Sequence, residues 1–199
     1  IEGCLMKERK LPASGGYDVS SQLIVALFAS QLDDQLRRLK EAVAELGTAH
    51  LQWQPQPGIN TIGMLMAHIA VAEVYWINVA PAGIPLESDG DNLILKTIGI
   101  RMDDDGLPLT ADARHPATLV GKTLADYLSI LDRMRQATHA TMRTWQDTDL
   151  DQGYTLRDAT VTRSWILYHI LEHFAAHYGQ ILLLIHLMRE AGVLAKKPE

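Results

Sequence analysis

Apolar residues recur at steps of three and four along four stretches of the chain, and this spacing predicts four amphipathic helices. The predicted helices run over about Ser20–Leu46, Thr61–Val79, Thr123–Trp145 and, beginning at Thr160 or Thr162, to Gly192. Gly47 follows the first helix directly and is expected to cap its C-terminus. Four such helices in a chain of 199 residues favour an all-α fold, namely a four-helix bundle.

The segments outside these helices are rich in proline, glycine and polar residues. We expect residues 1–19 to form an irregular N-terminal arm, residues 20–192 a single domain and residues 193–199 a tail. The connection Ala80–Gly121 is expected to be largely irregular, with a short strand or helix over Leu93–Ile100. So long an insertion between helices is often functional, for instance as a pocket wall.

The last predicted helix carries two histidines within its apolar face. His173 and His177 are four residues apart, so their side chains differ by about 40° in direction and by one turn in height, and both imidazoles can reach one point. Neutral imidazoles in mostly apolar surroundings are typical ligands of zinc or nickel. A histidine in such a place can equally be a core residue bonded to a carbonyl group, so the pair alone leaves both interpretations open.

Two further histidines belong to this candidate site. His169 lies one turn before His173 and offers either a third ring or an outer-shell group. His68 faces the interior of the second predicted helix, because its neighbours one turn away are Met64, Leu65, Val71 and Ala72. On its own, His68 fits a core histidine. Its significance comes from being the second inward-facing histidine element of the chain.

Composition narrows the classes of function. The formal net charge is −6 and the basic residues are scattered among acids, which argues against a nucleic-acid surface. The longest apolar run, Ile181–Met188, is too short to span a bilayer and contains His186, so we expect a buried helix and no membrane partner. The lone Cys4 cannot form an internal disulfide, which fits a reducing, cytoplasmic compartment.

Other polar residues are interpreted as structural. The run Asp103-Asp104-Asp105-Gly106 lacks the alternating acids and closing glutamate of a calcium loop, so we expect a solvated turn. Glu172 lies about 100° from His173 around the helix and faces away from the histidine pair. His139 lies off the apolar face of its helix and is expected at the surface. Candidate pocket or outer-shell groups, each more often structural than catalytic, are Glu73, Tyr75, Trp76, Tyr178 and Gln180.

Two stretches resemble a known family. Asn60–Trp76, with the sequence NTIGMLMAHIAVAEVYW, resembles the second-helix signature of the DinB/YfiT-like metalloenzyme superfamily. Tyr168–Ile181, with the sequence YHILEHFAAHYGQI, resembles its last-helix signature. The resemblance covers about Ser20–Gly192 and implies a four-helix bundle with a long connection between its second and third helices. It also implies a divalent metal cofactor, zinc or nickel, whose ligands here would be His68, His173 and His177.

The resemblance points to a class of chemistry but not to one reaction. Some members resemble thiol S-transferases that use bacillithiol or mycothiol, and related proteins include a mycothiol-dependent isomerase. Three histidines leave at least one position of a metal open to water or substrate. We therefore expect a metal-dependent transferase of the thiol-dependent S-transferase type, or a hydrolase, that acts on a small molecule. A low-molecular-weight thiol is the expected partner, and no side chain is identified as catalytic.

Two alternatives stay open. The bundle could be a non-catalytic metal-binding or stress-response protein, or a metal-free bundle whose histidines belong to the core. Excess apolar surface on the first or third helix would suit a homodimer. No Ser-His-Asp arrangement, glycine-rich phosphate loop or pair of carboxylates competes with the histidines as a catalytic motif.

Overall fold

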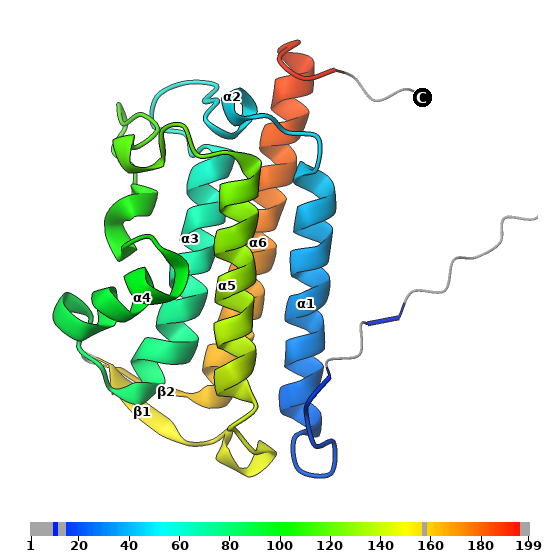
Figure 1. Ribbon diagram of the computed structural model, residues 1–199, viewed down its shortest axis with the longest axis vertical. Helices are drawn as coiled ribbons and strands as arrows, with labels where there is room; N and C mark the ends of the chain where they lie inside the picture. Colours follow the sequence, from blue (N-terminus) through cyan, green and yellow to red (C-terminus); the bar gives the residue numbers. More distant parts are fainter. Residues whose placement is uncertain (1–9, 12–14, 157–158, 196–199) are drawn as a thin grey trace, which may run out of the picture.

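Four long helices pack side by side in the computed structural model, which describes residues 10–11, 15–156 and 159–195 (Figure 1). They are α1 (Leu23–Val43), α3 (Ile62–Val74), α5 (Leu124–Met142) and α6 (Arg163–Glu190). Helices α1 and α6 run in one direction, and α3 and α5 run in the other (Figure 1). The prediction of a helical fold is confirmed, while Cys4 and most of the predicted arm lie outside the described residues.

Shorter elements join the four long helices. Along the chain they are α2 (Thr48–Leu51), the π-helical η1 (Tyr75–Val79), η2 (Ala80–Ala82), η3 (Leu86–Gly90), α4 (Asp91–Ile98), η4 (Met102–Asp105), η5 (Ala117–Leu119), η6 (Asp147–Asp149), β1 (Gly153–Leu156) and β2 (Ala159–Thr162). The strands pair antiparallel, with Gly153 opposite Thr162. The fold is therefore mostly, rather than wholly, α-helical.

The structure corrects three details of the sequence interpretation. The connection after α3 is largely helical rather than irregular, and its segment Leu93–Ile100 falls mainly in α4. Gly47 caps the N-terminus of α2 instead of the C-terminus of α1, and its carbonyl oxygen accepts a hydrogen bond from the His50 amide. The segment before α6, for which the sequence interpretation predicted no strand, forms the hairpin β1–β2, and its β-branched residues such as Val161 favour a strand. Short elements of this kind carry too few residues for a helical or strand period to be evident.

Threonine side chains cap the N-termini of the two helices that carry the candidate histidines. The Thr61 hydroxyl accepts a hydrogen bond from the Met64 amide at the start of α3, 3.1 Å away. At the start of α6 the Thr162 hydroxyl accepts one from the Trp165 amide over 3.2 Å, so Thr162 rather than Thr160 is the cap. Each cap satisfies an amide that would otherwise lack a partner in the first turn.

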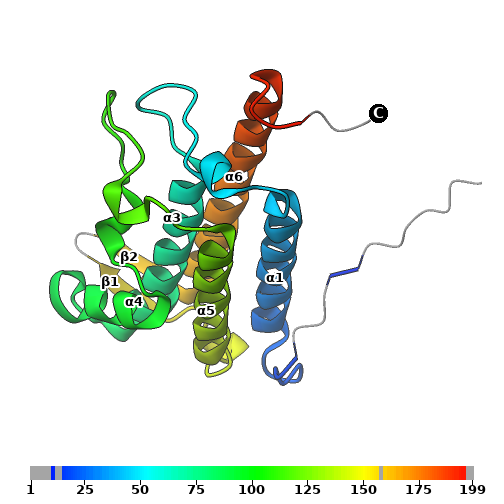
Figure 2. The same cartoon turned by 45° about the horizontal axis from the view of Figure 1, so that its top comes forward.

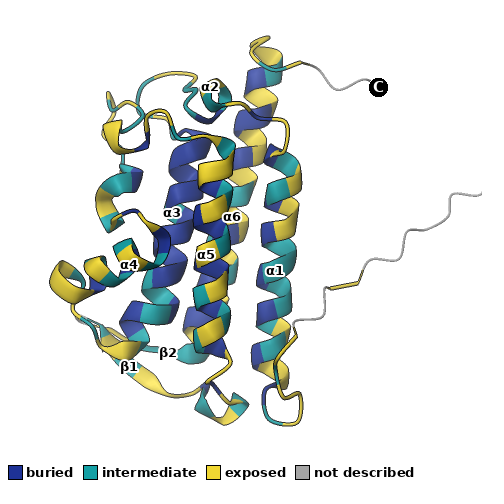
Figure 3. Ribbon diagram, in the orientation of Figure 1, coloured by how far each residue is buried: buried dark blue, intermediate teal, exposed yellow. Residues whose placement is uncertain are grey.

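Helix α3 lies at the centre of the bundle and is buried along its length (Figure 3). Every residue of α3 except His68 is buried. At Gly63 the neighbouring helix approaches so closely that a β-carbon would lie 2.5 Å from the Tyr127 hydroxyl oxygen. The segment Ile62–Ala82 is long and apolar enough to cross a membrane, but 78% of its most apolar window is buried inside the protein. It is therefore the core helix of the bundle. The expectation that Ile181–Met188 is a buried helix holds for one face only, because Leu182, Leu183 and Leu187 in that segment are exposed.

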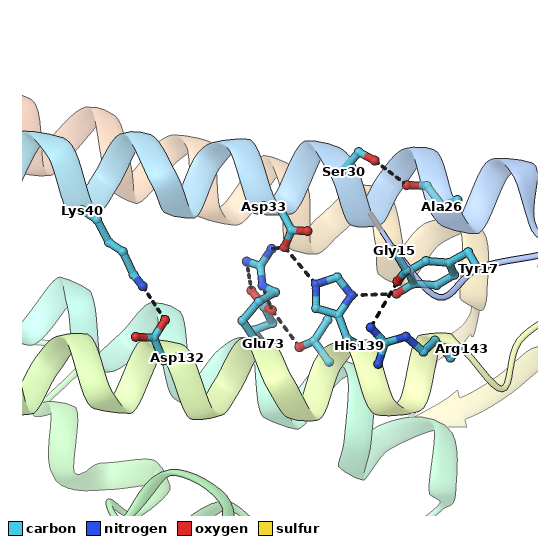
Figure 4. Close-up of polar contacts among 12 residues, drawn as sticks. Gly15, Tyr17, Ala26, Ser30, Asp33, Lys40, Glu73, Asp132, His139 and Arg143 are labelled. Carbon is cyan, nitrogen blue, oxygen red and sulfur yellow. Dashed lines mark hydrogen bonds and ion pairs between the residues drawn. The ribbon is translucent and has the colours of Figure 1, made fainter. Parts of the chain in front are cut away.

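A buried cluster of charged residues ties α3 to α5 and α1, and we call it the Glu73 network (Figure 4). The Glu73 carboxylate, 1% exposed, accepts hydrogen bonds from Arg135 Nη2 (3.1 Å) and from the Thr138 hydroxyl (2.7 Å). Arg135 also donates to Asp33 over 3.2 Å. Glu73 is thus a structural residue rather than a pocket group.

The Glu73 network extends to the beginning of the described chain. His139 Nε2 donates to Asp33 Oδ1 over 3.0 Å, and the Tyr17 hydroxyl lies 2.8 Å from His139 Nδ1 (Figure 4). Burial raises the pKa of Tyr17 to about 12, so its hydroxyl keeps the proton that it donates to His139. The expectation that His139 is a surface residue is wrong, because its side chain is only 16% exposed and links two helices to the N-terminal segment.

Removing Glu73 should destabilise the protein far more than breaking a surface ion pair. Glu73→Ala leaves the Arg135 guanidinium buried with half of its partners lost, and we expect the free energy of unfolding in urea to fall by about 3–5 kcal/mol. Asp132→Ala, which removes the partly exposed pair with Lys40 between α5 and α1, should cost less than about 1 kcal/mol. Equal losses in the two variants would contradict this account.

Candidate metal centre

Helices α3 and α6 bring three of the predicted histidines together. His173 Nε2 lies 3.1 Å from His68 Nε2 and 3.1 Å from His177 Nε2. Each of the three rings offers one nitrogen, and no two of these nitrogens are more than 4.8 Å apart. We call these three residues the histidine centre. Its geometry follows from the four-residue spacing on α6 and from the antiparallel packing of α3 against that helix.

Second partners fix how two of the rings present their nitrogens. His68 Nδ1 donates to Asp105 Oδ2 over 2.8 Å, and His177 Nδ1 donates to Gln180 Oε1 over 2.9 Å. Asp105 is itself anchored, because its side chain is 3% exposed and its other oxygen accepts a hydrogen bond from the Leu107 amide. With their protons on Nδ1, both imidazoles turn an Nε2 lone pair towards His173.

The donor set fits a metal ion better than it fits a self-contained hydrogen-bond network. His173 Nε2 carries at most one proton and could donate it to only one of the two facing lone pairs. At least one of those lone pairs would then stay unsatisfied in a partly buried site, which is unfavourable. A cation shared by the three nitrogens satisfies all of them. The 3.1 Å separations are also close to the roughly 3.3 Å expected between nitrogens bound to one tetrahedral zinc ion.

Burial keeps His173 and His177 in the form that binds a metal. Burial, together with the neighbouring His177, His68 and His169 rings, lowers the pKa of His173 to about 3. Burial also lowers the pKa of His177, although its hydrogen bond to Gln180 acts in the opposite direction. Both rings are therefore neutral at pH 7, and neutral imidazole is the form that offers a lone pair to a metal.

His169 does not join the histidine centre. Its ring stacks on Trp165, with centroids 4.7 Å apart, and meets the edge of Trp76 at 5.1 Å. The centroid distance to His173 is 5.8 Å. Burial lowers the pKa of His169 as well. Of the two roles open from the sequence, the structure thus places His169 in an aromatic cluster beside the centre rather than as a third ring.

Of the other candidate pocket groups, Gln180 contacts the histidine centre, while Tyr178 and Tyr75 pack against other side chains. Gln180 contacts the histidine centre directly through His177, as an outer-shell group does. Tyr178 lies beneath the Arg38 guanidinium, 5.3 Å from its ring centre, and supports the packing of α1 against α6. Tyr75 meets the edge of Trp76, which in turn contacts His169.

Asp105 is the functional residue that the sequence interpretation missed. The run Asp103–Gly106 was expected to be a solvated turn, and Asp103 is indeed exposed, but Asp105 is 2% exposed and bonds His68. Within the single turn η4, three consecutive acids point in different directions. No periodicity in the sequence distinguishes Asp105, which is buried, from the two acids before it. The acidic run was a signal, but only packing against α3 identifies Asp105 as the partner of a histidine.

These features define a class of protein: a mostly helical bundle with a three-histidine centre between two of its helices. The model of the DinB superfamily matches residues 31–181, which include all three histidines, and the chain belongs to this superfamily. A search of the curated proteins finds no match.

A solved structure shares the fold. The structure of a conserved protein from Enterococcus faecalis superposes with a TM-score of 0.62 and 19% sequence identity, over 82% of this chain and 96% of that chain. A DinB-like protein from Bacillus cereus is similar with a TM-score of 0.49 and 19% identity, over 86% of this chain and 95% of that one. At this identity the likeness to the Enterococcus protein concerns the fold alone.

Replacing Asp105 should weaken metal binding without removing a ligand. In Asp105→Asn the amide oxygen can still accept from Leu107, while the amide NH2 faces His68 Nδ1 and favours the tautomer that carries its proton on Nε2. We expect the affinity for zinc, measured by competition with a chromophoric chelator, to fall by about 10- to 100-fold. Asp103→Asn, in the same turn but exposed, is the matched control and should bind as the wild type does. An unchanged affinity of Asp105→Asn would show that Asp105 does not orient His68.

The metal-free protein should lose stability as the pH falls. The pKa of His173 is lower in the folded state than its ordinary 6.5, so the unfolded chain binds more protons between about pH 6.5 and pH 3. With a chelator present, we expect the free energy of unfolding to fall by about 1 kcal/mol from pH 6.5 to pH 5, a value reduced for the partial exposure of the ring. His173→Gln should flatten this dependence, and an identical slope in that variant would contradict the assignment.

Proposed function

We propose that this protein binds one divalent metal ion, zinc or nickel, through His68, His173 and His177, and uses it to catalyse a reaction on a small molecule. The observation that supports the proposal is the convergence of three Nε2 atoms, two of them oriented by Asp105 and Gln180. The reaction we favour is attack of a low-molecular-weight thiol, or of water, on a small electrophile. This is the chemistry of a thiol-dependent S-transferase or of a hydrolase.

The division of labour among the residues follows from their positions. When bound, the metal would supply Lewis-acid activation of a thiol or of water at neutral pH. His68 and His177 are held with their lone pairs towards the centre by Asp105 and Gln180. Asp105 places a buried negative charge beside His68, which strengthens that ring as a donor. No side chain of the centre is assigned as a proton acceptor for the reaction.

The second candidate is a non-catalytic metal-binding bundle, for instance one that acts in a stress response. The half-buried state of the histidine centre favours catalysis over this role. Structural sites are usually closed by four protein ligands, whereas three histidines are the pattern of a site that admits a substrate. The His68 side chain is 26% exposed, so small molecules can reach the centre.

We also propose that the protein is cytoplasmic and forms a homodimer. Helix α1 carries a cluster of exposed apolar side chains near its N-terminus, at Leu23, Ile24 and Leu27. Among the described residues of α5 no large apolar side chain is comparably exposed. If the protein forms a dimer, the first helix is therefore a better candidate interface than the third predicted helix.

The metal content of protein purified without chelator or nickel resin tests the first part of the proposal. We expect about one zinc or nickel ion per chain in the wild type, loss of it in His173→Ala, and retention in His186→Ala, an exposed histidine of the same helix. A wild-type protein that takes up no zinc or nickel from micromolar solutions would favour core histidines and end the proposal.

Catalysis needs a separate measurement. With a thiol and a small electrophile as substrates, removal of the metal should abolish turnover and reloading should restore it. Unchanged turnover in the metal-free protein would rule out metal-dependent catalysis. Full metal occupancy without turnover on any thiol and electrophile tested would favour the non-catalytic alternative.

A further inference from the structure

A pocket of about 480 Å3 lies where α3 begins and the second half of α6 passes it. Its wall is the loop between α2 and α3, and its lining residues are Pro55, Gln56, Gly58, Ile59, Asn60, Leu65, Gln180, Leu183, Leu184 and Leu187. We call it the apolar pocket. Its volume lies within the roughly 300–1,000 Å3 that is usual for small-molecule sites.

The apolar pocket adjoins the histidine centre. On α3 it reaches Leu65, one turn before His68, and on α6 it reaches Gln180, one turn after His177. Gln180 belongs to both sites, because it lines the pocket and accepts the hydrogen bond from His177 Nδ1. A molecule that occupies the pocket can therefore extend past Gln180 to the three histidines.

The chemistry of the lining selects an uncharged ligand. Among the described residues that form the pocket, none carries a charge, and its polar side chains are the amides of Gln56, Asn60 and Gln180. A carboxylate or phosphate placed there would lose its hydration without gaining a cation, which is costly. Apolar surface is abundant, because Leu183 is 55% exposed and Leu187 36% exposed at the rim. Covering these side chains with an apolar ligand is favourable, because it removes apolar surface from water.

The wall of the apolar pocket is held in place by the long connection after α3. The Gly58 amide donates to the Ala113 carbonyl oxygen over 3.0 Å, and the His115 amide donates to Gln54 Oε1 over 3.1 Å. A β-carbon at Gly58, where φ is +77°, would lie 2.5 Å from the Ala111 carbonyl oxygen. The two loops lie at the same end of the bundle (Figure 2). The pocket is thus largely preformed, and ligand binding does not require the loop to be ordered first.

We propose that the apolar pocket binds the uncharged, apolar part of the small molecule on which the histidine centre acts. This assignment rests on the proposed function, which it extends by naming the class of substrate. An alkyl or aryl group lies against Leu65, Leu184 and the exposed leucines, and a neutral polar group such as an amide lies beside Gln180. Thiols and electrophiles with a charged group at that distance from the reacting atom are excluded by the same lining.

The first test uses a neutral fluorescent probe, N-phenylnaphthylamine, on metal-free protein. The wild type should bind it saturably at one site. Leu183→Glu places a charge at the pocket and should weaken binding by about tenfold or more. Leu182→Glu is the matched control, because Leu182 is the adjacent exposed leucine, 41% exposed and outside the lining, and it should bind as the wild type does. No binding by the wild type, or equal loss in both variants, would overturn the proposal.

Displacement of the same probe tests the charge of the ligand. Octanamide should displace it at least about tenfold more effectively than octanoate at pH 8, because only the neutral compound enters without an unpaired charge. Equal displacement would overturn the assignment of an uncharged ligand. Sedimentation measurements then give the oligomeric state of the Leu183→Glu and Leu182→Glu variants. A change of oligomeric state in Leu183→Glu alone, without probe binding by the wild type, would assign the leucines to contact with a second copy.

The second test joins the apolar pocket to the histidine centre. Alkyl hydroxamates of increasing chain length chelate zinc, so in zinc-loaded wild type their affinity should rise by roughly threefold per methylene as the chain fills the pocket. The rise should be lost in Leu183→Glu and kept in Leu182→Glu, with zinc content equal in all three proteins. Affinity independent of chain length in the wild type would overturn the assignment. Failure of the wild type to take up zinc would instead refute the proposed function, and the probe measurements would then decide on the pocket alone.

Discussion

Helix α3 is enclosed by α5, α6 and the connection that follows it, so that Glu73 is 1% exposed and the His68 side chain 26% exposed. A buried polar group is tolerated only when its hydrogen bonds are made within the protein. Two polar side chains of α3 meet this condition differently. Glu73 is paired completely with Arg135 and Thr138, whereas His68 is bonded on one nitrogen and presents the other to the histidines of α6.

Glu73 and His68 therefore differ in role: Glu73 holds α3 to its neighbours, whereas His68 belongs to the candidate metal site. In the Glu73 network the Arg135 guanidinium pairs with the carboxylates of Glu73 and Asp33, so the cluster holds three helices together. In the histidine centre the lone pairs outnumber the protons available to them. A site with spare lone pairs, neutral rings and partial exposure has the properties of a metal site, and the Glu73 network beside it keeps α3 in register with its neighbours.

The connection between α3 and α5 serves the site in two places. Its η4 turn supplies Asp105, which orients His68, and its later part holds the loop that forms the wall of the apolar pocket. Both contacts involve residues distant in sequence from the groups that they support. The connection thus contacts both the histidine centre and the wall of the apolar pocket.

The sequence by itself determined the four long helices and the convergence of His173 and His177, because a helical period and a spacing of four residues are properties of a continuous segment. His68 was joined to that pair by the family resemblance, and the packing of α3 against α6 brings it there. The tertiary structure alone decided which polar groups find partners. Asp105 became a partner of His68 rather than part of a solvated turn, His139 became a half-buried link between two helices, and His169 joined an aromatic cluster. The apolar pocket likewise exists only where the loop between α2 and α3 meets α3 and α6. Asp105 lies in a very short turn, where no local periodicity shows which side will face the core. His139 and His169 lie on long helices, whose period gives the face of each residue but not its partner on another element.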